Sequence, residues 1–305
     1  MVHAPGNPLP GGCNRQHAIA SLNIRAKGAQ VPDANTPPAH RSLDPEKPSI
    51  ARVNDYFLGG SFNTPVDRAF AARALRALPA MKTAAMANRH FLRRVVTYLV
   101  ENGVRQFVDL GCGIPTVGGV HHVARALTPD TPDTAVVYVD NDPIAVAQSK
   151  RLLRDDPATV VLDADLRHPT EILDHPAVHG LLDFTRPIAV LMIGVLHFIP
   201  DRDNPHRILA GYRDNLPRGS YLALSHLSDE AASPELQAQV RDGIRTYQND
   251  AGPLAARSHA TLASWLTELE IIPPGITIAN AWRATTNDPT GTDHDLVLGA
   301  VARLP

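Results

Sequence analysis

Three aspartates stand at the ends of consecutive strand-like runs, where their carboxylates can hold a ligand. Asp109 comes just before a glycine-rich turn, Asp140 closes the next run, and Asp165 follows the third. The carboxyl ends of parallel strands meet at one edge of a sheet, where open α/β sheets bind ligands. We therefore expect Asp109 to attract an ammonium group, Asp140 to accept from two ribose hydroxyls, and Asp165 to accept from an adenine amino group.

Neighbouring residues leave these assignments partly open. Asp163 competes with Asp165 for the adenine amino group. Leu166, which follows Asp165, is also predicted to bind the cofactor. Asn141 and Asp142 are weaker candidates for the ribose. A single acid at the end of a strand is often merely solvated or capping a helix, so the prediction depends on three acids in consecutive units.

The turn Asp109-Leu-Gly-Cys-Gly-Ile-Pro-Thr116 indicates what lies against these acids. Gly111 and Gly113 permit a tight turn and let a ligand approach the backbone. A dinucleotide-binding turn requires a third glycine where Thr116 stands. Without a pyrophosphate to hold, an acid before the turn is tolerated, and S-adenosylmethionine carries an ammonium group for it. An ordinary turn between a strand and a helix is the alternative.

The acceptor side is predicted at the end of a fourth, nearly all-apolar run, Ile188–Val195. Such a run is typical of a central strand buried on both faces. Gly194 allows a ligand to approach closely, and His197 follows at the mouth of the crevice. A histidine there can remove a proton from an acceptor or orient it. His226 is the second candidate for this role, and a histidine that merely packs at the rim is the alternative.

The remaining pattern supplies the elements that position these residues. Short apolar runs alternate with helical segments, which predicts right-handed βαβ units and a mostly parallel sheet. Two late strand-like runs are separated only by a loop, which predicts one antiparallel strand inserted in the sheet. The predicted strands are Gln106–Leu110, Ala135–Asp140, Thr159–Leu162, Ile188–Val195, Ser220–Leu224, Ile276–Trp282 and Asp295–Val301, and the helices between them are Thr116–Ala126, Pro143–Leu153 and Asn204–Asn215.

Three regions follow from the pattern along the chain. Residues 1–46 are rich in Pro and Gly without an apolar period, and we expect this leader to be disordered. Residues 47–104 carry three helical segments, broken at Gly59-Gly60 and Pro79 and ended by Gly103, which predict a helical cap or lid. Residues 105–305 form the predicted ligand-binding core of a doubly wound α/β fold.

Composition excludes several classes of protein. The 29 basic and 31 acidic residues nearly balance, so no strong field favours nucleic acid or an anionic membrane. Cys13 and Cys112 are too few for a disulfide framework or a multi-cysteine zinc site, and no metal is expected. The longest apolar run is too short to span a bilayer, and the N-terminus does not read as a signal peptide. We expect a cytoplasmic protein with a small-molecule acceptor and neither a nucleic-acid nor a membrane partner, and the sequence leaves its oligomeric state open.

With these residues, the chain resembles the actinobacterial S-adenosylmethionine-dependent methyltransferases once grouped as a domain of unknown function, within the class I methyltransferase superfamily. The resemblance covers residues 48–303, and its more specific segments are those at 55–60 and 196–198. The matching segments are 48–60 with Asn63 and Asp67, 87–94, 109–116, 138–143, 163–167, 195–201, 219–226, Pro274-Gly275 and Trp282-Arg283. Cys112, Asn54 and His168 depart from the family pattern, and none of them removes a cofactor group.

The resemblance implies the Rossmann-like class I fold, with a seven-stranded sheet whose last strand is antiparallel, and S-adenosylmethionine as methyl donor. The family's first motif implies a loop folded over the donor as part lid and part acceptor pocket, with packing at a helix end as the alternative. Its residues here are Arg52, Tyr56, Gly59, Gly60 and Asn63.

The sequence leaves two alternative roles open for each of two further residues, Arg89 and Cys112. By its charge, Arg89 is a candidate for the donor carboxylate, although with Arg93 one turn away it equally suits a solvated face. Cys112, flanked by glycines near a helix N-terminus, is either a thiol of lowered pKa or, more often, a small packing residue.

The function that these observations favour is in-line methyl transfer from S-adenosylmethionine to an unidentified small molecule. A nicotinamide-dependent oxidoreductase is disfavoured by Thr116 and by the acid at 109. A regulator that binds S-adenosylmethionine without catalysis is the alternative from another class.

Overall fold

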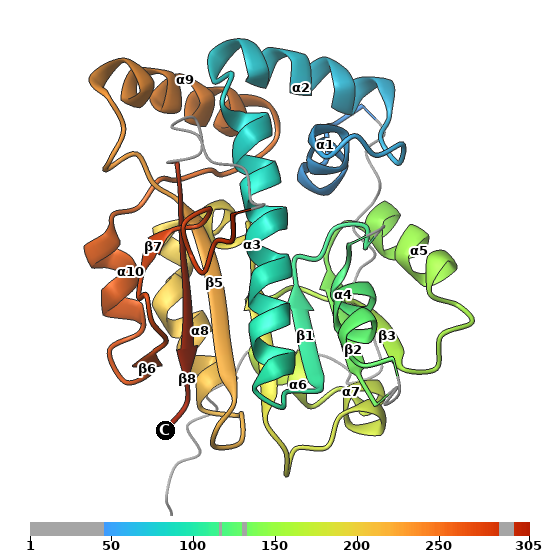
Figure 1. Ribbon diagram of the computed structural model, residues 1–305. Coiled ribbons are helices and arrows are strands. Elements are labelled where there is room, and N and C mark those ends of the chain that lie inside the picture. Colours follow the sequence, from blue (N-terminus) through green and yellow to red (C-terminus); the bar gives the residue numbers. More distant parts are fainter. Residues whose placement is uncertain (1–45, 116–117, 130–132, 287–295) are drawn as a thin grey trace, which may run out of the picture. The chain divides into compact units, whose positions relative to one another are not determined.

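The computed structural model describes residues 46–115, 118–129, 133–286 and 296–305. These residues belong to one compact unit built on a single sheet of eight strands (Figure 1). The predicted leader, apart from Glu46, lies outside the described residues. No helix in the described part of the chain is both long and apolar enough to cross a membrane.

Five parallel strands form the centre of the sheet in the order β3-β2-β1-β4-β5. All five have largely apolar sequences; β1, β2, β4 and β5 are fully buried, as expected of strands covered on both faces, whereas the edge strand β3 is only partly buried. Leu110 lies opposite Val139 in the register, so β1 and β2 end side by side and bring their terminal acids to one edge. The strands are β1 (Gln106–Leu110), β2 (Ala135–Asp140), β3 (Thr159–Asp163), β4 (Ile188–Met192) and β5 (Tyr221–Leu227).

The antiparallel part of the sheet confirms the predicted late strand. β8 (Val297–Arg303) runs antiparallel to β5, and two short strands pair with its other side, β6 (Glu270–Ile271) and β7 (Thr277–Ile278). The predicted strand Ile276–Trp282 is reduced to β7, and β6 is an additional strand that the sequence does not predict, which gives eight strands instead of seven. Asp295, the predicted start of the last strand, lies outside the described residues.

Helices cover both faces of the sheet (Figure 1). Alternate residues of each strand enter separate clusters: Phe107 and Val136 pack beneath the long helix α3, whereas Val108 and Val137 pack on the opposite face. α3 (Met81–Glu101) and α4 (Val120–Leu127) cover the first face, and α5 (Pro143–Leu152) packs against β2 and β3. α6 (Pro169–Leu173), α7 (Pro176–Leu181), α8 (Pro205–Arg213) and α10 (His259–Trp265) cover the second face.

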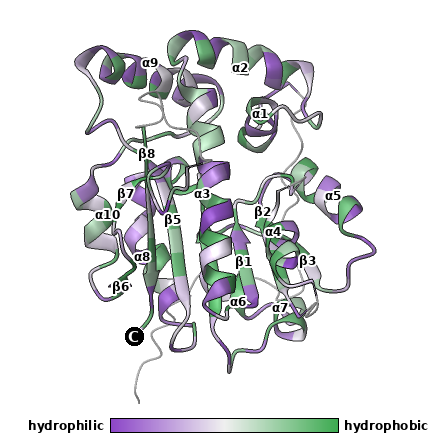
Figure 2. Ribbon diagram, viewed as in Figure 1, coloured by the Kyte–Doolittle hydropathy of each residue, from purple (hydrophilic) through white to green (hydrophobic). Residues whose placement is uncertain are grey.

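The cap has a hydrophobic core of its own, which includes a helix that the sequence patterns did not predict. α1 (Ile50–Phe57) and α2 (Pro65–Ala77) pack with α9 (Pro234–Asp250), and Phe70 meets Tyr247 edge to face at 4.9 Å between ring centroids. In Figure 2 the ribbons of α2 and α9 alternate between apolar and polar residues, as amphipathic helices do. The predicted division at residue 104 stays a prediction, and the core of the cap draws on α9 from beyond it.

Local chemistry fixes where the elements near the site begin and end. Asp142 caps α5 by accepting from the Ala145 N–H at 2.8 Å, and Pro143 takes the first helical position, which confirms the prediction for this helix. The predicted helix from Thr116 begins only at Val120, and Thr116 itself lies outside the described residues. The predicted strand to Val195 ends at Met192, because Gly194 has a φ of 71° that a strand cannot contain.

Candidate functional site

Asp140 closes β2 beneath the glycine turn and is 7% exposed. Its Oδ2 accepts from the Gly113 N–H at 2.7 Å, and its Oδ1 accepts from the Asp142 N–H at 2.9 Å. A carboxylate has about four acceptor positions, so two remain for ribose hydroxyls. Burial raises the pKa of Asp140 to about 6, although its backbone hydrogen bonds lower it.

Asp109 is the penultimate residue of β1, near Asp140, and is equally buried. Burial raises the pKa of Asp109 to about 7; the charge of Arg89 lowers this pKa and the charge of Asp140 raises it. Arg89 reaches over the turn from α3, with its Nη1 3.5 Å from the Gly118 carbonyl oxygen. The structure therefore brings together three predicted donor-binding side chains, two acids and one cation.

The two glycines of the turn have different roles. Gly111 has a φ of 67°, and a Cβ there would lie 2.3 Å from Val195 Cγ2, so close packing against the end of β4 requires glycine. Gly113 has a φ of 58°, but a Cβ there would meet no atom of the described residues within 4 Å. The space beside Gly113, next to Asp140, is therefore open to a ligand.

Cys112 lies between these glycines as a packing residue. Burial, and then the charges of Asp140 and Asp109, raise the pKa of its thiol well above the usual value. Burial together with the two acids therefore does not support the alternative of a lowered pKa.

The acids beyond β3 are arranged differently from those on β1 and β2. Asp165 accepts from Arg167 through both carboxylate oxygens, at 3.0 Å from Nε and 2.6 Å from Nη2. Asp163 is exposed and lies opposite Asp140 in the strand register. Leu166 is buried, and its carbonyl accepts from the Tyr212 hydroxyl at 2.9 Å. The adenine assignment therefore stays open between the two acids; Asn141, the weaker candidate for the ribose, is exposed.

A hydrogen-bonded group that the sequence patterns did not predict surrounds Gly194. The Gly194 N–H donates to Ser225 Oγ at 2.8 Å, and Ser225 Oγ donates to Asn88 Oδ1 at 2.5 Å. A Cβ at position 194 would approach Asn88 Nδ2 to 3.3 Å. A signal for both is present in the sequence, since Asn88 and Ser225 lie in segments that match the family and Ser225 directly follows the predicted strand Ser220–Leu224.

His197 lies beyond β4 in the short 3-10 turn Leu196–Phe198. Its Nδ1 is buried without a hydrogen-bond partner among the described residues. Burial lowers the pKa of His197 well below the usual value, and the charges of His226 and Arg257 lower it further. The imidazole is therefore neutral near pH 7, the state in which it can accept a proton.

His226 is fully buried on β5, and both of its ring nitrogens are engaged. Arg257 can only donate, so its Nη1 donates to His226 Nε2 at 2.8 Å, and the Nδ1–H donates to the Leu227 carbonyl at 2.7 Å. Burial lowers the pKa of His226 to about 4. With no lone pair free for an acceptor proton, the geometry of His226 does not support the base role considered for it.

Arg257 holds the turn that carries His197. Its Nη2 donates to the Ile199 carbonyl at 2.8 Å and to Asp201 Oδ1 at 2.7 Å, and its Nη1 lies 3.3 Å from the Leu196 carbonyl. The sequence patterns did not single out this arginine, because it lies in an irregular segment about sixty residues after the turn that it supports.

The loop after α1 supports the packing interpretation of the first motif. Asp55 accepts from the Phe62 N–H at 2.8 Å and from Asn63 Nδ2 at 2.9 Å. A Cβ at Gly60 would lie 2.0 Å from Asp55 Oδ1, so Gly60 and Asn63 shape the loop. Gly59 and Tyr56 differ from them, because a Cβ at Gly59 would meet nothing within 4 Å in the described part of the chain and Tyr56 is 36% exposed.

Arg52 is 4% exposed, which places it inside the protein and not on an acceptor surface. Its Nε lies 2.7 Å from Asp67 Oδ2, and its Nη1 lies 3.3 Å from Asp142 Oδ2. It therefore joins the cap to the loop that follows β2.

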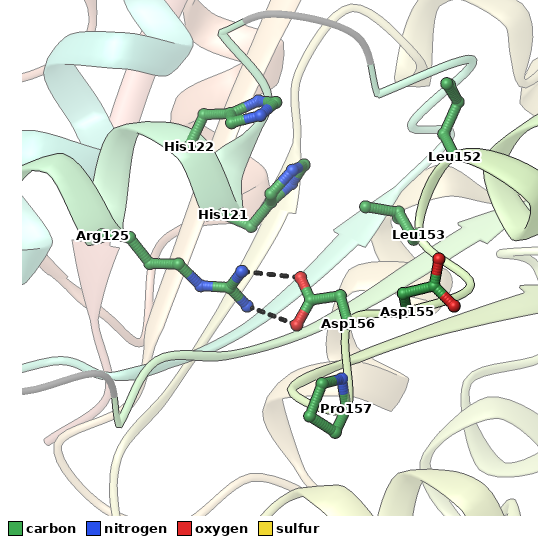
Figure 3. Close-up of a pocket in the computed structure, with 8 residues that line it drawn as sticks. All are labelled: His121, His122, Arg125, Leu152, Leu153, Asp155, Asp156 and Pro157. Atoms are coloured by element: carbon green, nitrogen blue, oxygen red, sulfur yellow. Dashed lines mark hydrogen bonds and ion pairs between the residues drawn. The ribbon is translucent and has the colours of Figure 1, made fainter.

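A cavity of about 420 Å³ between α4 and the end of α5 lies apart from these residues (Figure 3). Several of its polar groups have partners within the protein: Arg125 pairs with Asp156 at 2.6 and 3.0 Å, and His121 Nδ1 lies 2.6 Å from the Tyr138 hydroxyl. No residue predicted for the site lines this cavity. The lining residues are His121, His122, Arg125, Leu152, Leu153, Asp155, Asp156 and Pro157.

Comparison with known proteins agrees with this geometry. A family profile described as S-adenosyl methyltransferase matches residues 36–305. A DUF574 family protein from Streptomyces avermitilis is 37% identical, with a TM-score of 0.79 over 85% of this chain and 98% of its own. A candidate methyltransferase from Thermobifida fusca is 36% identical, with a TM-score of 0.78 over 87% of this chain and 97% of its own. No protein with a curated description matches the chain.

The profile spans nearly all of the described residues, including both donor-side acids and the turn that carries His197. The sheet order and the antiparallel β8 agree with the fold expected of class I methyltransferases. The chain therefore belongs to the S-adenosyl methyltransferase family, whose cofactor is S-adenosylmethionine.

Proposed function

We propose that this protein transfers the methyl group of S-adenosylmethionine to a small-molecule acceptor, with the donor held at the carboxyl ends of β1 and β2. The observation that supports this most is the pair Asp109 and Asp140, buried side by side next to the open space at Gly113. Once deprotonated, two adjacent buried carboxylates suit a ligand that brings ammonium and hydroxyl donors, and the residues present therefore fit this cofactor.

Each donor-side residue has a distinct task in this proposal. Asp140 would accept from the ribose hydroxyls with the two acceptor positions that its backbone donors leave open. Asp109 and Arg89 would face the amino and carboxylate groups of the methionine part. When bound, S-adenosylmethionine supplies an activated methyl on a sulfonium, so the protein chiefly aligns the acceptor and excludes water.

His197 would act as the base for an acceptor that begins protonated. Its imidazole would take up the proton that the acceptor loses on methylation, at a ring nitrogen facing the acceptor. The neutral imidazole has a free lone pair, whereas that of His226 is occupied by Arg257. A small-molecule acceptor and a cytoplasmic location remain predictions from the sequence.

The test is transfer of labelled methyl from S-adenosylmethionine to small molecules in an extract, with any labelled product isolated as the substrate. His197→Asn should then lower turnover by about 100-fold or more, as loss of a general base does. His168→Asn is the matched control, because its side chain is 52% exposed.

Different outcomes separate the alternatives. Binding of S-adenosylhomocysteine without transfer of label to any extract would favour the non-catalytic regulator. If His197→Asn retains nearly full turnover on the isolated substrate, the base role is wrong while the donor site stands.

A further inference from the structure

A continuous chain of hydrogen bonds joins the cap to the glycine turn. Arg52 Nε lies 2.7 Å from Asp67 Oδ2, and Arg52 Nη1 lies 3.3 Å from Asp142 Oδ2. The Asp142 N–H donates to Asp140 Oδ1 at 2.9 Å, and the Gly113 N–H donates to Asp140 Oδ2 at 2.7 Å. The cap is thereby linked to the carboxylate assigned to the ribose.

The cap end of this chain is rigid. Asp67 is fully buried and also accepts from the Thr64 N–H at 2.7 Å and the Ser49 N–H at 2.9 Å, so it fixes the starts of α2 and α1. Arg52 is 4% exposed and spans two carboxylates with one planar guanidinium. A lysine has one nitrogen on a flexible stem and cannot reproduce this bridge.

The other end is held by a single side chain with two functions. Asp142 Oδ1 caps α5 by accepting from the Ala145 N–H at 2.8 Å, while its Oδ2 faces Arg52. Its own N–H fixes the Asp140 carboxylate. A shift of the Asp142 backbone away from Arg52 would therefore move a donor to Asp140.

We propose that Arg52 is a positioning residue for the methyl donor: held by Asp67, it fixes Asp142 and, through it, the carboxylate of Asp140. The inference rests on the donor site given under Proposed function and gives Arg52 a role other than contact with the acceptor. Because coupling is reciprocal, donor binding should also stabilise the start of the cap.

The test is the affinity for S-adenosylhomocysteine, measured by isothermal titration calorimetry. Arg52→Met and Asp142→Asn should each weaken binding about tenfold, as loss of a hydrogen bond to a charged group does. Arg52→Lys should bind S-adenosylhomocysteine as weakly as Arg52→Met does, because a lysine cannot span both carboxylates. Asp142→Asn keeps an oxygen to cap α5, so it tests the chain of hydrogen bonds even if Arg52→Met fails to fold.

Arg73→Met is the matched control and should bind S-adenosylhomocysteine as the wild type does, since Arg73 pairs with Asp250 on the cap surface.

A double-mutant cycle separates positioning from general support of the fold. If Arg52 acts through Asp140, Arg52→Met should weaken binding little further once Asp140→Asn is present. Ligand should also slow amide exchange in 50–57 of the wild-type protein, and less so in Asp142→Asn. Wild-type affinity in both Arg52→Met and Asp142→Asn, or fold-changes that simply multiply in the cycle, would overturn the inference. Failure of the wild-type protein to bind the ligand would instead overturn the donor site.

Discussion

Asp109 and Asp140 hold protons more tightly than exposed aspartates do, because burial penalises their charged forms. A ligand that donates hydrogen bonds or brings an ammonium group requires the deprotonated carboxylates. Binding must therefore release protons near neutral pH, which ties the donor site to a measurable pH dependence.

The affinity for S-adenosylhomocysteine should accordingly rise with pH through the pKa values of about 6 and 7 and level off above them. Below each pKa, affinity should fall by up to about tenfold per pH unit and per group. Calorimetry in buffers of different ionisation enthalpy measures the released protons. In Asp109→Asn the upper step should vanish, and a flat profile in the wild-type protein would contradict the role of these acids.

The same two groups act in the opposite direction on the stability of the free protein. Their folded-state pKa values lie above the unfolded value near 3.8, so the folded state binds more protons between about pH 4 and 7. Their contribution to stability is present at the acidic end of this range and is lost as the pH rises through it. Asp109→Asn should therefore stabilise the free protein relative to wild type at pH 8 more than at pH 5, as measured by thermal unfolding. An equal shift at both pH values would contradict the raised pKa of Asp109.

Among the elements, those with continuous apolar runs could be predicted from the sequence, and those shaped by distant partners could not. The parallel strands can be predicted because their apolar runs are unbroken, and in β1, β2, β4 and β5 this pattern reflects burial of every residue. α9 was missed, although Ser233 and Pro234 mark its start, because its apolar residues face the cap and not the sheet. The bonds from Arg257 to the His197 turn join residues far apart in the sequence, and no local pattern encodes them.

The glycine turn allows a matched pair of substitutions. Gly111→Ala should lower stability by about 2 kcal/mol or more, because a Cβ at 2.3 Å from Val195 forces the turn away from β4. Gly113→Ala should cost only about 1 kcal/mol, for its left-handed backbone, yet weaken ligand binding by filling open space. Thermal unfolding and calorimetry of both variants test this difference. Equal stabilities, or unchanged affinity in Gly113→Ala, would contradict the separate roles.

In the whole molecule, the cap is connected to the rest of the fold by packing and by buried polar bonds. Its core draws on α9 as well as on the N-terminal helices, and Arg52 ties it to the loop after β2. The sequence predicts the cap as a set of helices. It does not predict the contacts with α9 or the bond from Arg52 to Asp142 that stabilise the cap, because these join residues far apart in the sequence.

Truncation of Tyr247 tests this picture of the cap. Tyr247→Ala removes the edge-to-face contact with Phe70 and should cost about 3–5 kcal/mol, as other large-to-small changes in a core do. Denaturant unfolding measures the loss, and Tyr56→Ala, at an exposed position of the same cap, should cost far less. Similar losses in the two variants would show that α9 adds little to the cap.

The donor site itself is tested most directly by calorimetric titration of S-adenosylhomocysteine into the wild-type protein, Asp140→Asn and Asp155→Asn. The wild-type protein should bind, and NAD should not. Asp140→Asn should weaken binding about 10- to 100-fold through lost hydrogen bonds to a charged group. Asp155→Asn, whose side chain is 86% exposed, should bind as the wild type does. Binding that is absent in the wild type, or that Asp140→Asn leaves unchanged, would contradict a methyl donor held at the ends of β1 and β2.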